Sequence, residues 1–379
     1  MKTNCDDDYL DYIMKIIEYI TQLGSGGAER FTVDMCNELS KHHEVILCLS
    51  YSLKDYGFYK DEISPNVKVV SFDKKKGISF TLPFRIFKFI KKEKPDIVHT
   101  HLSAIIYTAF SALFCKKVKF FHTIHSVAKE EAKGLIGEKV RRFLFKRKFI
   151  TPVTISKSSL ESFKRLYKMD ASLVNNGRDI PRVIDVSENV KKEFEKYRET
   201  PETKVLVHLA HVGYPKQQDV MAKVADRLIK EGYKLEILFI GRLCEQNMAD
   251  FIESLGNKHL HLLGTRTNPL EYLKMADAFC LTSSHEGLPI SLIEALGVGT
   301  IPVCTPVGGI VDLVQDGVNG FLSKGIDEDA YYAALKRYLD TPAEKLEKMR
   351  TEAIKSYEPY SMRECAKNYE GLFVNTIAG

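Results

Sequence analysis

The sequence predicts an α/β protein with two doubly wound domains, each with a parallel sheet covered by helices on both faces. Short runs rich in Val, Ile and Leu alternate with helical patterns along the whole chain. Such near-continuous apolar runs are typical of parallel strands that are buried on both faces. The chain has 379 residues, a length that accommodates two domains with separate cores.

Each half of the chain supplies its own strands. We expect those of the first half at residues 13–23, 44–50, 67–72, 97–100, 119–122 and 152–155, and those of the second half at residues 204–209, 234–241, 259–263, 278–281 and 301–304. The pattern therefore predicts an N-terminal domain over residues 1–182, a C-terminal domain over 183–360, and a final helix, 361–379, that crosses back to the first domain. In such folds ligands bind at the carboxyl ends of the strands, in a cleft between facing domains.

Composition narrows the class of protein. Apolar residues make up 44% and charged residues 28%, as in soluble globular proteins, and no apolar run approaches the ~20 residues of a membrane helix. The start of the chain, with Asp6–Asp8, lacks the features of a signal peptide, and we expect a cytoplasmic location. The same triplet contains a DxD spelling, but it precedes the first strand and we expect no metal there. Eight scattered cysteines without a CxxC pair indicate free thiols.

The basic segment Lys139–Lys148 has two interpretations. The net charge of +5 is concentrated in the first half of the chain, and this segment mixes Lys and Arg with bulky apolar residues. As a helix it would lie on the anionic inner surface of the cytoplasmic membrane. It would equally form an ordinary surface helix that packs Phe143 and Leu144 inward. We expect no nucleic-acid partner.

Two carboxylates eight residues apart are the most informative feature. Glu286 precedes the break Gly287-Leu288-Pro289, and Glu294 follows it within an apolar run. Pro289 is well placed as the first residue of a helix, so Glu286 would lie at the mouth of the helix and Glu294 about two turns inside. Free helix N–H groups between them would bind an anion. A nucleotide-sugar, with polyol at both ends and phosphate between, fits this pattern.

Other candidates occupy predicted strand ends. The turn containing Gly26 and Gly27 lets backbone approach a ligand closely, although it lacks both the dinucleotide fingerprint and the P-loop Lys. His125 follows a strand, where imidazole can bind a sugar hydroxyl or transfer a proton. Lys216 precedes a helix and would meet a diphosphate. The remaining polar or glycine strand ends are Gly241, Arg242, Thr265 and Arg266.

Together, the Gly26-Gly27-Ala28-Glu29-Arg30 turn, the Glu286/Glu294 pair, Lys216 and the two-domain layout resemble the retaining family 4 glycosyltransferases of the GT-B fold. The resemblance spans nearly the whole chain. It implies transfer of a sugar from a UDP- or GDP-sugar to a lipid-linked or polysaccharide acceptor, in capsule or lipopolysaccharide biosynthesis. It also implies no metal or other cofactor, and an acceptor site on the first domain.

The resemblance assigns a role to each residue that matches the family's motifs. Glu294 would bind the donor ribose, and Glu286 with the N–H groups of Gly287 and Leu288 would hold the donor sugar. Lys216 would bind the diphosphate. Gly27 would let the backbone approach the same group, and His125 would face the sugar.

One position departs from the family pattern. His211 stands where the family usually has an arginine that partners the lysine on the diphosphate, and Arg242 is a possible substitute. The strand end Gly241-Arg242-Leu243 is altered as well. Two alternatives to a transferase therefore stay open: a nucleotide-sugar 2-epimerase of the same architecture, and a non-catalytic nucleotide-sugar binding module.

Overall fold

The computed structural model describes residues 12–77, 79–132 and 134–378. Cys5 and the Asp6–Asp8 triplet, in which no metal was expected, lie outside the described residues. The chain forms two compact units. The first runs to Gly177 and resumes at Met362, and the second is Arg178–Ser361. The sequence-based limits of 182 and 360 lie a few residues from this division.

The first unit contains a parallel sheet of seven strands in the order β3-β2-β1-β4-β5-β6-β7. The strand order reverses between β1 and β4, which makes this point the switch point of a doubly wound sheet. Six of the strands occupy the ranges predicted for them, with ends that differ by a few residues, and β7 was not predicted. Their bounds are β1 Lys15–Ile20, β2 Glu44–Leu49, β3 Lys68–Ser71, β4 Ile97–His101, β5 Lys119–Ile124, β6 Thr151–Thr154 and β7 Ser172–Leu173.

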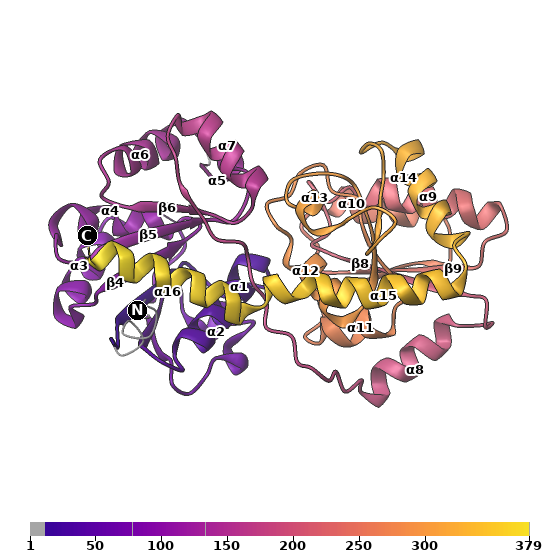
Figure 1. Ribbon diagram of the computed structural model, residues 1–379, viewed down its shortest axis with the longest axis horizontal. Helices are drawn as coiled ribbons and strands as arrows, with labels where there is room; N and C mark the ends of the chain where they lie inside the picture. Colours follow the sequence, from indigo (N-terminus) through magenta and orange to yellow (C-terminus); the bar gives the residue numbers. More distant parts are fainter. Residues whose placement is uncertain (1–11, 78, 133, 379) are drawn as a thin grey trace, which may run out of the picture. The chain divides into compact units, whose positions relative to one another are not determined.

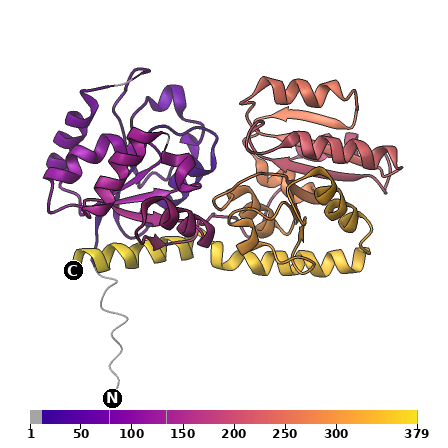
Figure 2. The ribbon, with the colours of Figure 1, turned by 90° about the horizontal axis from the view of Figure 1, so that it is seen from above.

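Helices cover both faces of this sheet (Figure 1). On one face lie α1 (Gly27–Leu39) and the C-terminal helix α16 (Met362–Ala378). These two helices pack together, with the ring centroids of Phe31 in α1 and Tyr369 in α16 6.2 Å apart. Figure 2 shows α16 running along this unit. A large apolar cluster on the other face joins the sheet to α3, α4, α6 and α7. The remaining bounds are α2 Leu53–Tyr56, η1 Lys60–Glu62, α3 Leu82–Glu93, α4 Ala104–Phe114, α5 Ala128–Ala132, α6 Leu135–Lys146 and α7 Lys157–Tyr167.

The second unit repeats the plan with six parallel strands in the order β10-β9-β8-β11-β12-β13. Its switch point lies between β8 and β11. Five of these strands were predicted, whereas the short β13 was not. The bounds are β8 Lys204–Leu209, β9 Leu235–Ile240, β10 Leu260–Gly264, β11 Ala278–Leu281, β12 Ile301–Cys304 and β13 Phe321–Leu322.

Apolar side chains of α9, α10 and α14 pack on one face of the second sheet. The helix α12 contacts α11 and α15. Helix α14 begins after Asp327, whose side chain caps it by accepting from the Ala330 N–H at 3.0 Å. The helices are α8 Glu188–Tyr197, α9 Gln218–Lys230, α10 Gln246–Ser254, α11 Pro269–Met275, α12 Ile290–Val298, α13 Ile310–Leu313, α14 Glu328–Leu339, α15 Ala343–Tyr357 and η2 Glu358–Tyr360.

Two local predictions need correction. Pro289 is the N-cap of α12 rather than its first residue, so Glu294 lies little more than one turn inside the helix. In α6, Leu144 is buried as predicted, but Phe143 is 49% exposed and Phe145 takes the inward position. Leu144 and Phe145 both join the apolar cluster that packs on the sheet, so the buried stripe of α6 runs along their side and Phe143 lies outside it.

Other expectations concern thiols and membrane helices. Of the described cysteines, Cys244 alone is exposed and the other six are buried free thiols, as predicted. Among the described residues, no helix is both long and apolar enough to cross a membrane.

Candidate active site

In the second unit, the loops that follow β8 and β11 are tied together at the switch point. The Thr282 hydroxyl lies 2.9 Å from the carbonyl oxygen of Lys216 and 2.8 Å from that of Gln217. The Ser284 N–H donates to the Pro215 carbonyl at 2.9 Å. These contacts hold Lys216 and Glu286 side by side, although 70 positions separate them in the chain.

Lys216 and Glu286 form an ion pair, with Nζ 2.5 Å from Oε1. The Ser283 hydroxyl donates to the same carboxylate oxygen at 2.5 Å. Both charged side chains are largely buried, with 14% of Lys216 and 9% of Glu286 exposed. A cation and a carboxylate with so little solvent around them interact strongly, and a ligand's phosphate and hydroxyl groups would find both charges already in place.

Glycines of the loop after β12 support the Glu286 loop. Gly308 has a φ of 57°, and a Cβ at this position would collide with the carbonyl oxygen of Glu286. The Gly309 N–H donates to the Gly287 carbonyl at 2.7 Å, and the Thr305 hydroxyl donates to that of Ser283 at 2.7 Å. A side chain at position 308 would therefore displace Glu286.

Glu294 lies in α12 and is 5% exposed. Its Oε1 accepts from Nε of Arg178 at 2.7 Å, and Arg178 is itself 6% exposed. This pair was not predicted from the sequence. The available signal was a carboxylate in an otherwise apolar helix, which requires a buried partner.

His211, the residue in place of the expected arginine, lies in the loop before α9. Burial, followed by the neighbouring Lys216 charge, lowers the pKa of His211 below its ordinary value. Its Nε2 lies 3.2 Å from the Tyr214 carbonyl oxygen. His211 is therefore neutral near pH 7 and adds no second positive charge beside Lys216.

Gly241 and Arg242 follow β9. The φ of Gly241 is 151°, and a Cβ there would collide with the Ala210 carbonyl, so glycine permits the close approach of these two loops. The Arg242 side chain is exposed.

At the end of β10, Arg266 makes contacts within its own unit. The Arg266 guanidinium donates to Tyr272 Oη at 2.9 Å and to the Leu263 carbonyl, and it lies 3.6 Å from Glu193. These contacts hold its side chain on its own unit. The neighbouring Thr265 is exposed.

The glycine turn and His125 belong to the first unit. Gly26 is the N-cap of α1, and the Glu29 side chain lies so close that a Cβ at position 26 would collide with it. Helix α1 begins at Gly27, so Gly27 belongs to its first turn.

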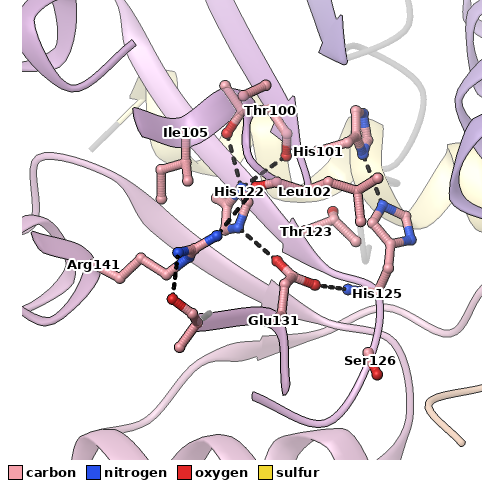
Figure 3. Close-up of polar contacts among 12 residues, drawn as sticks. Thr100, His101, Leu102, Ile105, His122, Thr123, His125, Ser126, Glu131 and Arg141 are labelled. Carbon is pink, nitrogen blue, oxygen red and sulfur yellow. Dashed lines mark hydrogen bonds and ion pairs between the residues drawn. The ribbon is translucent and has the colours of Figure 1, made fainter. Parts of the chain in front are cut away.

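His125 is held from two sides. Its Nε2 lies 2.9 Å from Nδ1 of His101, and its main-chain N–H donates to Oε2 of Glu131 at 2.7 Å (Figure 3). The other oxygen of Glu131 lies 3.0 Å from Nε2 of His122. The ring of Phe31 packs on His125 edge to face, with centroids 5.2 Å apart.

Behind His125 lies a buried polar network that the sequence analysis missed. Oε2 of Glu18 lies 2.7 Å from Nε2 of His101, and Oε1 lies 3.1 Å from Nδ1 of His99. Nε2 of His99 lies 2.7 Å from the Thr123 hydroxyl, which is 2.6 Å from Tyr369 Oη. The signals were a glutamate inside an apolar strand and two histidines at alternate positions of the next strand.

Protonation states follow from this arrangement. Burial alone would raise the pKa of Glu18, but His99 and His101 lower it to about 2. Burial, reinforced by His99, lowers the pKa of His101 to about 4. Burial and then His101 lower the pKa of His125 well below its usual value. Near pH 7 the network therefore contains an ionised carboxylate and neutral His101 and His125.

Glu18, His99 and His101 offer three potential metal-ligand atoms within 4.8 Å of one another. Each of those atoms already has a complementary hydrogen-bond partner inside the network. All three side chains are fully buried. The geometry is that of a hydrogen-bonded chain, which satisfies these buried groups without an ion.

Two family models cover most of the chain. The model for glycosyltransferase family 4 matches residues 25–208, and the model for glycosyl transferases group 1 matches residues 189–356.

Curated relatives match both units. The capsular polysaccharide biosynthesis glycosyltransferase CapH of Staphylococcus aureus is 28% identical over 75% of this chain and 79% of its own length. The UDP-Gal:alpha-D-GlcNAc-diphosphoundecaprenol alpha-1,3-galactosyltransferase of Escherichia coli is 27% identical over 67% of this chain and 69% of its own. An N-acetylgalactosaminyltransferase of Campylobacter jejuni, named for a PP-undecaprenol-linked acceptor, is 26% identical over 86% of this chain and 89% of its own.

Solved structures share the fold. HepE of Anabaena, crystallised with UDP and glucose, superposes with a TM-score of 0.81 at 16% identity, over 96% of this chain and all of the other. WaaG, a glycosyltransferase involved in lipopolysaccharide biosynthesis, gives a TM-score of 0.69 at 13% identity, over 94% of this chain and 99% of the other.

Proposed function

The chain belongs to the family 4 glycosyltransferases of the GT-B fold, and from this premise we propose that it transfers a sugar from a UDP-sugar to a lipid-linked glycan acceptor, with retention of anomeric configuration. The product would be an intermediate of capsule, O-antigen or a related surface glycan. The observation that carries the donor site is the Lys216–Glu286 pair at the switch point of the second unit. Ligands of doubly wound sheets bind at that edge.

The donor's parts match the chemistry of the second unit. Lys216 binds the diphosphate, and Glu294 in α12 binds the ribose hydroxyls. Glu286 and the backbone of Gly287 and Leu288 at the mouth of α12 hold the sugar. UDP as the nucleotide is supported by the names of the Escherichia coli relative and of the Anabaena complex.

The acceptor proposal rests on two relatives. Both the Escherichia coli and Campylobacter jejuni enzymes are named for acceptors linked to undecaprenol through a diphosphate. A lipid-linked glycan of this kind is the acceptor we propose here. Because the matched curated relatives quoted above are transferases, a 2-epimerase or a non-catalytic module is not favoured.

We also propose catalysis without a metal. As the bond from the sugar to the diphosphate breaks, negative charge develops on the leaving phosphate, and a retaining reaction requires the acceptor to approach from the same side. The leaving phosphate would take the acceptor proton. Lys216 and helix N–H groups would stabilise the charge by being in place before the reaction. Because His211 is neutral, Lys216 would be the principal positive charge beside the leaving phosphate. The exposed Arg242 would supply a second positive charge.

Nucleotide titration tests the donor site. Lys216→Ala and Glu294→Ala are each expected to weaken UDP binding about tenfold or more, as loss of a charge-assisted hydrogen bond implies. Isothermal titration calorimetry with UDP and GDP measures this, with Lys274→Ala on the exposed surface of α11 as the matched control. Wild-type affinity for both nucleotides in both variants would show that the assignment is wrong.

The reaction itself is tested with UDP-sugars and a synthetic undecaprenyl-diphosphate glycan. NMR of the product reports whether the anomeric configuration is retained, and a parallel assay in EDTA reports whether a metal is needed. A new sugar nucleotide formed without acceptor would identify an epimerase instead. Donor binding without turnover on any acceptor would identify a binding module.

Contact with the membrane is a separate proposal, because the acceptor is lipid-linked. Arg141 of α6 donates to the Leu102 carbonyl and Arg142 donates to the Tyr167 carbonyl. These two side chains are therefore bonded within the protein. An exposed set remains on the same segment and would meet anionic lipid: Lys139, Phe143, Lys146, Arg147 and Lys148.

Sedimentation with phosphatidylglycerol vesicles tests this contact. Replacing Lys146, Arg147 and Lys148 by Glu is expected to release the protein from the vesicles, since each basic residue near an anionic surface adds about 1 kcal/mol. The matched control replaces Lys191, Lys192 and Lys196 of α8 in the same way. Equal release by both triple variants would argue against a specific role for α6.

A further inference from the structure

We propose that Glu18, acting through His101, fixes the tautomer of His125, so that Nδ1 of His125 is an unprotonated hydrogen-bond acceptor for a hydroxyl of the sugar substrate. Glu18 and His101 are then positioning residues, and His125 is the residue that touches substrate. The identity of the ligand rests on the proposed function. The tautomer does not, because it follows from contacts inside the first unit.

The register of the sheet brings these side chains together. Glu18 of β1 lies opposite His99 of β4, and His101 lies opposite Thr123 of β5. Because side chains alternate along a strand, residues 99 and 101 share a face with Glu18 and Thr123, and so does the continuation of β5 at His125. This face is the one covered by Phe31 of α1 and Tyr369 of α16.

The direction of each hydrogen bond can be assigned from the chemistry of its atoms. An ionised carboxylate only accepts, so both imidazoles donate to Glu18, His101 from Nε2 and His99 from Nδ1. The neutral His101 ring then has a lone pair at Nδ1, and that lone pair must accept the Nε2–H of His125.

The other arm of the network agrees with this assignment. When His99 carries this proton alone, its Nε2 accepts from the Thr123 hydroxyl. Thr123 then accepts from Tyr369 Oη. Every bond in the chain thus runs toward Glu18, and none is left with two donors or two acceptors.

His125 is therefore left with a bare Nδ1. In the part of the chain that the structure describes, this atom is buried and has no hydrogen-bond partner. Glu131 holds the main chain of His125, and Phe31 packs on its ring, so the ring cannot readily turn to satisfy the nitrogen. A buried acceptor without a donor is costly, and a sugar hydroxyl supplies the donor that the protein lacks.

The tautomer is measured directly on the full-length protein labelled with ¹⁵N-histidine. Long-range ¹H–¹⁵N correlation spectra distinguish a protonated from a bare ring nitrogen, and His125→Gln assigns the signal. The wild type is expected to show His125 with Nε2 protonated and Nδ1 bare. The Glu18→Leu variant is expected to lose this preference, with the Nδ1 signal moving toward the protonated position.

Kinetics separate positioning from general damage. Glu18→Leu is expected to lower the transfer rate about tenfold, the scale of one lost substrate hydrogen bond, while UDP affinity stays unchanged because its proposed side-chain ligands, Lys216 and Glu294, lie in the second unit. Glu236→Leu is the matched control. Glu236 is likewise held by two histidines, with oxygens 2.6 Å from His259 Nδ1 and 2.6 Å from His261 Nε2, but far from His125 in sequence and on the second unit.

The outcomes decide between the alternatives. A wild-type His125 protonated at Nδ1 overturns the proposal, and this result does not depend on the folding of any Glu18 variant. A bare Nδ1 that survives in Glu18→Leu also overturns it, as do equal losses of transfer in the Glu18 and Glu236 variants. If the wild type transfers no sugar at all, the proposed function fails, while the spectra still decide the tautomer.

Discussion

Nζ of Lys216 and Oε1 of Glu286 lie 2.5 Å apart, so each charge of the proposed donor site is neutralised by the other in the free protein. A donor must therefore exchange this ion pair for its own contacts. The pair has a measurable energetic consequence because both side chains are largely buried.

A double-mutant cycle tests this coupling. Lys216→Met leaves Glu286 as a buried carboxylate without its cation, and we expect it to lower the free energy of unfolding by about 2–4 kcal/mol. Adding Glu286→Gln removes the uncompensated charge and should restore about 1–3 kcal/mol. Urea denaturation of the wild type, both single variants and the double variant measures the coupling. Strictly additive effects would mean that the two charges do not interact.

The glycine after β12 provides a second prediction. In Gly308→Ala, the added methyl group collides with the Glu286 carbonyl, and we expect both lower stability and at least tenfold weaker UDP binding. Gly317→Ala is the matched control: its φ of 76° is equally left-handed, but nothing lies within 4 Å of the added Cβ. That variant should lose about 1–2 kcal/mol of stability and bind UDP normally. Similar UDP affinities in both variants would contradict the argument.

Buried histidines make stability depend on pH. Burial, followed by the effect of His99, lowers the pKa of His101 from its ordinary 6.5 to about 4. Burial, followed by the charge of Lys216, lowers the pKa of His208 from 6.5 to about 3. As pH falls below 6.5, the unfolded chain binds protons that the folded chain does not, so stability is lost. Between pH 7.5 and pH 5 each histidine should cost roughly 2 kcal/mol.

Urea denaturation at the two pH values measures this loss. His208→Gln should reduce the difference by about one histidine's share. A wild-type stability that is the same at both pH values would contradict the burial of neutral imidazoles. Glu18 does not contribute to the loss between pH 7.5 and pH 5. Its pKa is lowered in the folded protein, so the stability that it provides is lost only as the pH falls below its ordinary pKa near 4.5.

Thiol labelling tests the described cysteine environments. Cys244 is exposed, whereas Cys36, Cys48, Cys115, Cys280, Cys304 and Cys365 are buried, and burial raises the pKa of each of these six thiols. Because the thiolate is the reactive form, a Cys5→Ser protein should react rapidly with one equivalent of Ellman's reagent. Adding Cys244→Ser should abolish that fast phase and leave only labelling that follows unfolding.

Much of the fold was readable from local patterns. Runs such as Val205–Val207 and Ile237–Ile240 are apolar throughout, as is typical of a parallel strand covered on both faces. The short strands β7 and β13 were not predicted, because a run of two residues is too short to show a periodic pattern. Similarly, Lys216 and Glu286 could be picked out because they follow predicted strands, at the sheet edge where ligands bind, and Glu294 because it is a carboxylate in an otherwise apolar run.

The sequence by itself determined the two parallel-sheet units, the family, and the polar residues at the strand ends, because these depend on composition and short-range spacing. Tertiary structure alone decided the partners: Glu286 with Lys216, Glu294 with Arg178, and Glu18 with His99 and His101. Each of these pairs joins residues that are distant in the chain, so its existence depends on strand order and register. A sequence shows that a buried carboxylate needs a partner, but only the fold determines which side chain lies opposite it.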